Sequence, residues 1–260
     1  MPTNLGQNFL KDKEIVNKII SSANLKEDDF VLEIGPGKGI LTEELAKYAR
    51  KVIAIELDKN LVKLLSNKFD NNKKVEIIEG DILKINLLKL LGHFVPKQYK
   101  IIANIPYYIT SPIIRLFLEN ENPPSEMILM VQKEVAERIV AKAGQMSILA
   151  ISVQYYADAE ILFEVSRNSF DPVPEINSAV IKITNHQQST INNKTEVKKF
   201  FQIVKAGFSA KRKTLVNNLS NSLHLPKKEV EEKLKTAGIK PTARAQELSI
   251  ENWKTLTKLF

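Results

Sequence analysis

The sequence predicts an α/β fold with a mostly parallel central sheet, followed by a small all-α C-terminal domain. Three observations support this prediction. Short β-branched runs alternate with helical stretches across residues 30–183, as in βαβ units. The stretch 184–193 is polar and aperiodic. Beyond it, apolar residues recur only at helical spacing. We therefore expect one domain at 1–184 and a second at 195–260.

The α/β part begins with strands and helices in alternation. The predicted elements are a strand at 31–34, a helix at 40–48, a strand at 52–55, a helix at 59–69, and strands at 75–78 and 100–103. In the first of these helices Leu41 and Leu45 lie four residues apart, so they share one face.

The sheet is expected to continue with later strands. A helix begins near Ser111 and Pro112, because proline is acceptable in a first helical turn. Residues 127–131 are all apolar, which predicts a strand buried on both faces. The segments 147–156 and 179–183 are expected to complete the sheet.

The C-terminal part is expected to be helical throughout. Two of its helices are flanked by Pro226 and Gly238, and by Pro241 and the end of the sequence. The single tryptophan, Trp253, is expected in the core because it shares helical spacing with later leucines. A core-facing stripe is predicted from the helical spacing of Val197, Phe200, Phe201, Val204 and Phe208.

The composition excludes several classes of protein. The 260 residues include no Cys and only three scattered His, so zinc scaffolds, disulfides and thiol chemistry are excluded, and we expect no metal. No apolar run approaches the ~18 residues of a membrane span, and the N-terminus has no apolar signal region. We therefore expect a cytoplasmic protein without a membrane partner. No heptad segment is present, so a monomer is expected.

The net charge of +8 is concentrated at one end of the sequence. Residues 184–260 hold 15 Lys and Arg against 6 Asp and Glu, whereas residues 1–183 hold 23 against 24. A basic appendage on a near-neutral domain is typical of proteins that bind nucleic acid, because its cations displace counterions from phosphates. The alternative is a lysine-rich, solvated helical surface.

A glycine-rich loop follows the first predicted strand and precedes a helix, where nucleotide-binding loops lie. It runs from Glu33 to Gly39 and places Gly35, Gly37 and Gly39 at alternate positions. This spacing differs from the G-x-G-x-x-G of dinucleotide sites, and no phosphate-binding P-loop motif occurs. A tight glycine turn without phosphate-binding groups suits a cofactor with an amino-acid tail and one nucleoside, such as S-adenosylmethionine.

Polar residues also follow the next three strands at their carboxyl ends, where open α/β sheets bind ligands. Glu56 ends the second strand and can accept hydrogen bonds from both ribose hydroxyls. Asp81 follows the third strand and can accept from an adenine amino group, and Asn104 follows the fourth. Any one of them could be a solvated loop residue. Their joint register with the glycine loop indicates a cofactor site.

The tetrapeptide that begins at Asn104 has a specific chemical use. The exocyclic amino group of adenine is a poor nucleophile because its lone pair is delocalised into the ring. The Asn104 side-chain oxygen and the Pro106 carbonyl could accept its two hydrogens and direct the lone pair at a methyl group. Tyr107 could stack on a base taken out of its helix. The alternative is a structural turn with a buried tyrosine.

These motifs resemble, nearly end to end, the bacterial adenine dimethyltransferases of small-subunit (16S) ribosomal RNA. The matching segments are 5–10, the glycine loop, Asn104 to Tyr108, 170–180 and 206–215. The resemblance implies a Rossmann-like class I fold dependent on S-adenosylmethionine. It also implies that two adjacent adenosines in a 3′-terminal hairpin each receive two methyl groups, and it is compatible with a role in ribosome biogenesis.

The resemblance assigns individual roles as well. It implies cofactor contacts for Asn8, Leu10, Gly35, Glu56, Asp81 and Asn104, to which the loop adds Gly37. Phe170 is implied as a second aromatic against the target base, and its alternative role is to plug the core. A basic tip for phosphates is predicted where the apolar helical period breaks, at Lys211, Arg212 and Lys213; the alternative there is a solvated charge run.

The sequence also bears on four other functions. A methyltransferase of large-subunit (23S) RNA, of the macrolide-resistance class, shares the glycine loop, but segments 170–180 and 208–215 favour the small-subunit enzyme. A DNA adenine methyltransferase usually carries two prolines where this sequence has Ile105 and Pro106. A ribosome-assembly factor whose binding matters more than its catalysis stays open. A dehydrogenase is opposed by the glycine spacing.

Overall fold

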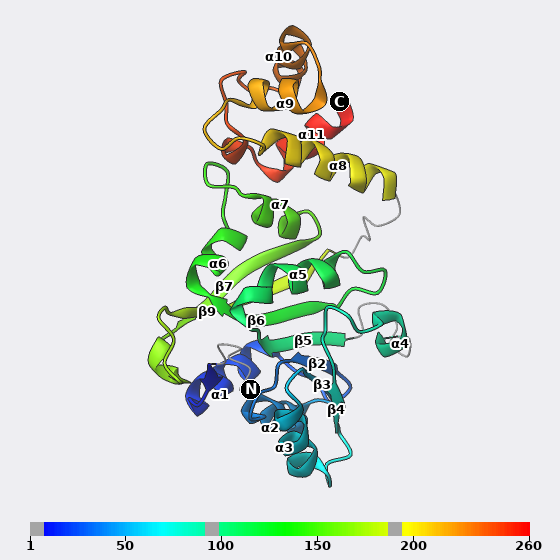
Figure 1. Cartoon of the computed structure of the whole chain (residues 1–260), viewed down its shortest axis with the longest axis vertical. Helices are drawn as coiled ribbons and strands as arrows, with labels where there is room; N and C mark the ends of the chain where they lie inside the picture. The colour runs from blue at the N-terminus through cyan, green and yellow to red at the C-terminus, as the bar shows by residue number, and fades with distance from the viewer. Residues whose placement is uncertain (1–7, 92–98, 187–193) are drawn as a thin grey trace. The chain divides into compact units, whose positions relative to one another are not determined.

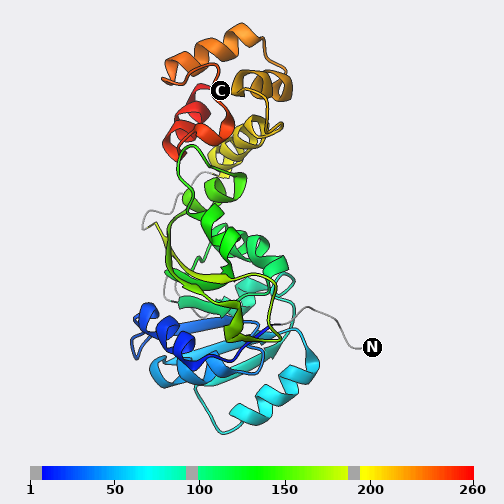
Figure 2. The same cartoon turned by 90° about the vertical axis from the view of Figure 1, so that its left-hand side faces the viewer.

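The computed structural model describes residues 8–91, 99–186 and 194–260, and the chain divides into two compact units (Figures 1 and 2). Unit 1 comprises Met1–Glu137 and Ala157–Asn185, and unit 2 comprises Arg138–Tyr156 and His186–Phe260. Unit 2 therefore takes in a segment that lies well before the predicted domain limit. The start of the N-terminal motif, residues 5–7, and most of the predicted linker, 187–193, lie outside the described residues.

Unit 1 is built on a seven-stranded sheet whose strand order reverses in the middle. From one edge to the other the strands are β4 (Val75–Glu79), β3 (Lys51–Glu56), β2 (Phe30–Ile34), β5 (Tyr99–Asn104), β6 (Glu126–Gln132), β9 (Ser178–Asn185) and β7 (Ala157–Val165). The first five are parallel, and the last two are antiparallel to their neighbours. A separate two-stranded sheet pairs β1 (Phe9–Leu10) with β8 (Phe170–Asp171).

The central strands are buried along almost their whole length. In β2, β3 and β6 every residue from the second onward is buried, except the last residue of β6. Such continuous apolar runs are expected of parallel strands that are covered on both faces. The predicted strands at 31–34, 52–55, 75–78, 100–103, 127–131 and 179–183 are confirmed with small extensions at their ends.

The helices of unit 1 cover this sheet (Figure 1). They are α1 (Lys13–Ala23), α2 (Ile40–Tyr48), α3 (Lys59–Phe69), α4 (Leu87–Leu91), α5 (Thr110–Leu118) and α6 (Lys133–Ile139), the last of which crosses the limit between the units. The predicted helices at 40–48 and 59–69 are confirmed, and α5 begins one residue before Ser111.

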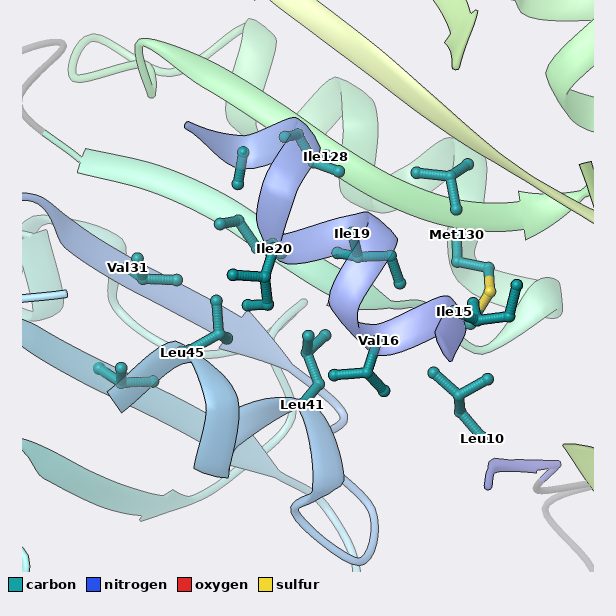
Figure 3. Packing of buried hydrophobic residues seen from close by; sticks show 14 of the residues in the cluster. Leu10, Ile15, Val16, Ile19, Ile20, Val31, Leu41, Leu45, Ile128 and Met130 are labelled. Carbon is teal, nitrogen blue, oxygen red and sulfur yellow. The ribbon is translucent and has the colours of Figure 1, made fainter. Parts of the chain in front are cut away.

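Helix α1 was not predicted, although its apolar residues follow the helical period. Ile15, Val16, Ile19 and Ile20 are buried on one face, and Figure 3 shows them directed at residues of β2, α2 and β6. The helix begins at Asp12, whose Oδ1 accepts from the backbone N–H groups of the first turn. Its apolar face closes one side of the sheet.

The predicted strand at 147–156 is wrong, because this segment forms helix α7 (Ile148–Gln154). The hydroxyl of Ser147 accepts from the Ala150 N–H at 3.2 Å and so starts the helix. Residues 149–153 are all buried, and periodicity alone cannot separate such a helix from a buried strand. Strand β7 begins at Ala157, directly after this segment, and is the strand that completes the sheet beside β9.

Unit 2 is helical, as predicted, apart from short turns. Besides α7 it contains α8 (Lys194–Gly207), α9 (Leu215–Leu223), α10 (Lys227–Thr236) and α11 (Ile250–Leu259), with a 3-10 turn at Ala245–Glu247. Trp253 is fully buried, as expected. Of the predicted stripe on α8, Phe200 and Val204 are buried, Val197 and Phe201 are partly exposed, and Phe208 follows the helix.

Helix α7 belongs to unit 2 because aromatic side chains join it to α8. The ring of Tyr155, at the end of α7, lies 4.3 Å from that of Phe200 and 5.4 Å from that of Phe201 between centroids. The ring of Tyr156 stacks on Phe201 at 6.0 Å. Aromatic pairs at such separations stabilise packing beyond the area that they bury.

Asp12 caps α1 and also makes a tertiary hydrogen bond. Replacement of Asp12 should therefore destabilise the protein more than replacement of a helix cap that has no such bond. Oδ2 of Asp12 accepts from the Ser169 hydroxyl at 2.9 Å, whereas Asp58 caps α3 in the same way. Among the described residues Asp58 has only its cap bonds. Asp12→Ala should lower the free energy of unfolding by about 1–2 kcal/mol, and by about 0.5–1 kcal/mol more than Asp58→Ala. Urea unfolding at pH 7 measures both.

The pH dependence of the stabilisation by Asp12 provides a control for this comparison. The Ser169 hydroxyl holds the pKa of Asp12 below its ordinary value of 3.8. The stabilisation is therefore present above that pH and is lost as the pH falls through the lowered pKa. Equal destabilisation by the two variants at pH 7 would show that the contact with Ser169 contributes nothing.

Candidate functional site

The candidate functional site lies at the carboxyl edge of the parallel strands, where the strand order reverses. Strands β4, β3, β2 and β5 are neighbours in this order, so the residues that follow them meet along one edge. Asp81, Glu56, Gly35 and Asn104 stand at these four strand ends. A cavity of about 450 Å³ opens there and is lined by all four residues. This volume is within the range of small-molecule sites.

The glycine loop after β2 is fixed by the carboxylate of Glu56, at the end of β3. Oε2 of Glu56 accepts from the Gly37 N–H at 3.2 Å, and Oε1 accepts from the N–H groups of Leu57 and Asp58 at 2.8 and 3.0 Å. The side chain is only 4 % exposed. A carboxylate can accept about four hydrogen bonds, so this geometry leaves acceptor capacity for a ligand.

Gly37 allows a close approach of the N-terminal segment to this loop. Its φ of +58° lies in the left-handed region, and a Cβ there would stand 2.9 Å from Cδ1 of Phe9. The Lys38 ammonium lies over the Phe9 ring, 4.9 Å from its centroid. Strand β1, which carries Phe9, pairs with β8. Asn8 and Leu10, on either side of Phe9, both line the cavity, as the resemblance implied.

Asp81 follows β4 and closes the far side of the cavity. Its Oδ1 accepts from the Leu83 N–H at 3.0 Å, and Oδ2 pairs with the Lys84 ammonium at 3.4 Å. The same turn brings Ile82 and Leu83 to the cavity wall. A polar acceptor beside two apolar side chains is a suitable surface for the edge and face of a purine ring.

The tetrapeptide after β5 borders the same cavity. Asn104 is half-buried, and Ile105, Pro106 and Tyr107 follow it along the wall. The Pro106 carbonyl accepts from the Ile109 N–H at 3.1 Å. A carbonyl oxygen has two lone pairs, so this bond leaves one for another donor. Asn104 and Pro106 therefore present two acceptors at one edge of the cavity.

Tyr107 is held in place by β9. Its hydroxyl and that of Ser178, which is fully buried, are 2.7 Å apart. Burial raises the pKa of Tyr107, and the hydrogen bond to Ser178 opposes this rise in part. The phenol is therefore neutral at physiological pH, and its ring is anchored at the hydroxyl end. The next residue, Tyr108, is 61 % exposed and also lines the cavity.

Phe170, implied by the resemblance as a second aromatic against the target base, lies in the core and not on the cavity wall. It is fully buried, belongs to the apolar cluster under α1, and is absent from the cavity lining. Strand β8 pairs it with Leu10 of β1, and this pairing turns its ring into the core. This burial agrees with the alternative reading, a phenylalanine that plugs the core, and the role of Phe170 against the target base stays a prediction.

Glu33 is the residue of this site that the sequence analysis missed. It lies in β2 and lines the cavity, although it is only 1 % exposed. Its Oε2 has no hydrogen-bond partner among the described residues. Burial raises the pKa of Glu33 to about 8. A charged residue inside a strand that is otherwise apolar and buried was the signal that could have found it.

The predicted basic tip is a loop of unit 2 between α8 and α9. Lys211, Arg212 and Lys213 are all exposed there. The buried Asn218 fixes the base of this loop, because its Nδ2 donates to the carbonyls of Gly207 and Ala210. The loop therefore presents three cations to solvent from an ordered base.

An apolar contact holds the other side of this basic loop. The ring of Phe208 stacks on Trp253 at 5.7 Å between centroids. Gly207 lies against the same indole, so closely that any Cβ there would collide with it. These contacts tie the start of the loop to α11.

The described residues include neither a cluster of metal ligands nor a helix that could span a membrane. In 8–91, 99–186 and 194–260, no three His, Cys, Asp or Glu side chains are grouped as metal ligands. None of the helices in these ranges is long and apolar enough to cross a membrane. His93, one of the three histidines, lies outside them.

Known structures share this fold. A dimethyladenosine transferase from Plasmodium falciparum superposes with a TM-score of 0.79 at 29% identity, covering 95% of each chain. The 23S rRNA methyltransferase ErmE superposes with a TM-score of 0.77 at 28% identity, covering 97% of this chain and 99% of that one. The predicted Rossmann-like class I methyltransferase fold is thereby confirmed.

Sequence comparisons agree over nearly the whole length. Proteins named ribosomal RNA small subunit methyltransferase A from Dehalococcoides mccartyi and Fusobacterium nucleatum are 44% and 42% identical over 256 and 257 residues. These alignments cover 98% of this chain and 87% and 96% of those proteins. A family model described as ribosomal RNA adenine dimethylase matches residues 1–260. On this full-length match, the chain belongs to the ribosomal RNA adenine dimethylase family.

Proposed function

We propose that this protein uses S-adenosylmethionine to dimethylate the amino groups of two adjacent adenosines near the 3′ end of 16S ribosomal RNA. One observation carries the proposal. Four consecutive strand ends bring the glycine loop, Glu56, Asp81 and Asn104 around one cavity. The assignment of the small subunit as the substrate rests on the names of relatives with more than 40% identity. The expected cytoplasmic location and monomeric state stay predictions.

The residues at this edge fit the cofactor. The glycine loop has positive φ at Gly35 and Gly37, so the backbone can approach an amino-acid tail closely. Glu56 retains acceptor capacity for ribose hydroxyls, and Asp81 stands beside apolar side chains that suit adenine. The unpaired oxygen of Glu33 offers a site for a donor or cation. When bound, S-adenosylmethionine supplies an electrophilic methyl group on a sulfonium centre.

The chain's own contribution to methyl transfer is positioning. The Asn104 side chain and the Pro106 carbonyl accept hydrogens of the target amino group and so direct its lone pair towards the methyl carbon. As the N–C bond forms, the bond between the methyl carbon and sulfur would break, and its electron pair would stay on the departing thioether. Positive charge develops on the nitrogen, and the two acceptors stabilise it. The nitrogen then loses its extra proton to water. No strong base is required of the protein.

The target base must leave its helix to reach these acceptors. Tyr107 offers a ring at the cavity wall, anchored through Ser178, on which an extruded purine can stack. After the first transfer the nitrogen retains one hydrogen, so one acceptor suffices for the second. The cavity must then accommodate a methyl group where a hydrogen had been.

The basic loop is proposed to bind RNA phosphates. Its three cations are exposed, and the loop is held at its base by Asn218 and Trp253. Phosphate contacts set the affinity and register of such a complex without reading its sequence. A role in assembly of the small subunit is compatible with the same surface.

Methyl transfer to two substrates in parallel tests the function. Tritiated S-adenosylmethionine is supplied with undermethylated small subunits and, separately, with large-subunit RNA, and the labelled nucleosides are analysed. Dimethyladenosine in the small-subunit RNA alone is the expected result. Label in large-subunit RNA alone would favour the macrolide-resistance class. Tight binding of small subunits without any label would identify an assembly factor.

Asn104→Ala should separate catalysis from cofactor binding. Removal of an acceptor that acts mainly in the transition state should lower kcat by about 10²–10³-fold. The Kd for S-adenosylhomocysteine, measured by calorimetry, should rise less than about tenfold. Asn104→Asp retains an acceptor oxygen and should lose less activity. Equal losses of kcat and cofactor affinity in the alanine variant would move Asn104 from catalysis to cofactor binding.

Replacement of Lys211, Arg212 and Lys213 by Gln should weaken RNA binding and its salt dependence. Loss of three phosphate contacts reduces the slope of log affinity against log salt by about 2–3. A matched control replaces Lys227, Lys228 and Lys235, which are exposed on α10 of the same unit, and removes the same charge. Filter binding from 50 to about 300 mM salt measures all three proteins. Identical slopes would mean that the basic loop is only a solvated surface.

A further inference from the structure

Tyr108 is an exposed aromatic residue at the wall of the cavity. It is 61 % exposed, whereas Tyr107, its neighbour in the chain, is partly buried. Within the described part of the chain, the Tyr108 hydroxyl makes no hydrogen bond and its ring meets no other ring. Burial of a tyrosine ring against a partner is favourable, so a bare ring beside a binding cavity indicates a surface that a ligand covers.

The position of Tyr108 separates it from the cofactor. Among the described residues, two other exposed apolar side chains line the cavity, Leu57 and Leu83. They follow β3 and β4, beside the carboxylates proposed for ribose and adenine, so the cofactor accounts for them. Tyr108 lies instead between β5 and α5 (Figure 1), next to the proposed acceptors of the target amino group. A ligand that covers Tyr108 is therefore expected to be part of the RNA.

A short 3-10 turn, Tyr107–Ile109, directs the two tyrosines differently. Such a turn has three residues per turn, so consecutive side chains point about 120° apart. The hydroxyl of Tyr107 meets that of Ser178 on β9 at 2.7 Å, while Tyr108 is left at the surface. The turn itself is ordered, because the hydroxyl of the buried Thr110 donates to the Tyr107 carbonyl at 3.2 Å. The two rings therefore offer separate stacking surfaces from one fixed turn.

The proposed reaction supplies a base that needs such a surface. When one adenosine leaves its stack to enter the cavity, the base next to it loses a stacking partner. An aromatic side chain can replace that partner, and it does so without reading the edge of the base. Methylation of an amino group leaves the face of the purine free. One ring can therefore hold the neighbouring base before and after that base is itself modified.

We propose that Tyr108 stacks on the base adjacent to the target adenosine, while Tyr107 stacks on the target itself. During one of the two modifications this adjacent base is the other adenosine of the pair. The inference rests on the proposed function and extends the RNA contacts of the site by one nucleotide. A tyrosine has only two side-chain torsions to fix, so the stack costs little conformational entropy. Tyr108 positions the substrate and takes no part in the transfer of the methyl group.

Removal of the ring and removal of the base test this contact together. Small subunits are reconstituted with 16S RNA whose synthetic 3′ segment carries an abasic site in place of one or the other adenosine. Methyl transfer to the remaining adenosine is measured as kcat/KM for the subunit. With intact RNA, Tyr108→Ala should lower kcat/KM about tenfold. In the wild type, the abasic site on the side covered by Tyr108 should cause a similar loss, and Tyr108→Ala should lose nothing further on that RNA.

Two variants serve as controls. Tyr108→Phe keeps the ring without its hydroxyl and should retain the wild-type kcat/KM. Tyr48→Ala removes a similarly exposed tyrosine, at the end of α2 and outside the cavity lining, and should also behave as the wild type. The Kd for S-adenosylhomocysteine, measured by calorimetry, should be the same in all four proteins. An unchanged Kd also shows that each variant is folded.

The outcomes separate this inference from the proposed function. Losses from the missing ring and the missing base that multiply, to about a hundredfold, would show that the two do not touch and would overturn the stack. A loss in Tyr108→Phe as large as in Tyr108→Ala would assign the effect to the hydroxyl and overturn it too. Weaker binding of S-adenosylhomocysteine by Tyr108→Ala would place the ring against the cofactor instead.

Two further results concern different claims. A wild-type rate in Tyr108→Ala on intact RNA would overturn the role of Tyr108 and leave the proposed function standing. Failure of the wild type to methylate intact small subunits would overturn the proposed function itself.

Discussion

The reversal of strand order between β2 and β5 is the constraint on which the rest of the site depends. Chain connections run away from these two strands in opposite directions, so their carboxyl ends leave a crevice that no crossover fills. Burial of β2, β3, β5 and β6 on both faces fixes the register of these strands. Side chains at four strand ends are thereby held around one cavity.

Around this crevice, hydrogen bonds and packing contacts to the backbone position the glycine loop and the N-terminal segment. Glu56 joins the end of β3 to the glycine loop after β2, and Phe9 packs on Gly37 from the N-terminal segment. The segment is itself fixed by the β1–β8 pair and by the Asp12–Ser169 hydrogen bond. One wall of the cavity thus depends on residues more than 150 positions apart in the sequence. The same pairing draws Phe170 into the core.

The basic loop of unit 2 is positioned in a different way. Its cations stand on a loop that has no regular structure of its own, so their position depends on the buried Asn218 and on the aromatic contact of Phe208 with Trp253. Charge alone would have favoured a diffuse, solvated surface. An ordered base lowers the entropy that such a loop must lose when it meets a phosphate backbone.

The sequence by itself determined the strands from β2 to β6 and the helices α2, α3 and α5, because their hydrophobic periods and glycine and proline limits are local. It also predicted that Glu56, Asp81 and Asn104 meet at one edge of the sheet, since parallel strands end at a common edge. Only the tertiary structure decided the helical state of α7, the burial of Phe170 and the unpaired oxygen of Glu33. Each of these depends on packing between segments distant in the chain, and a local pattern carries no information about such contacts.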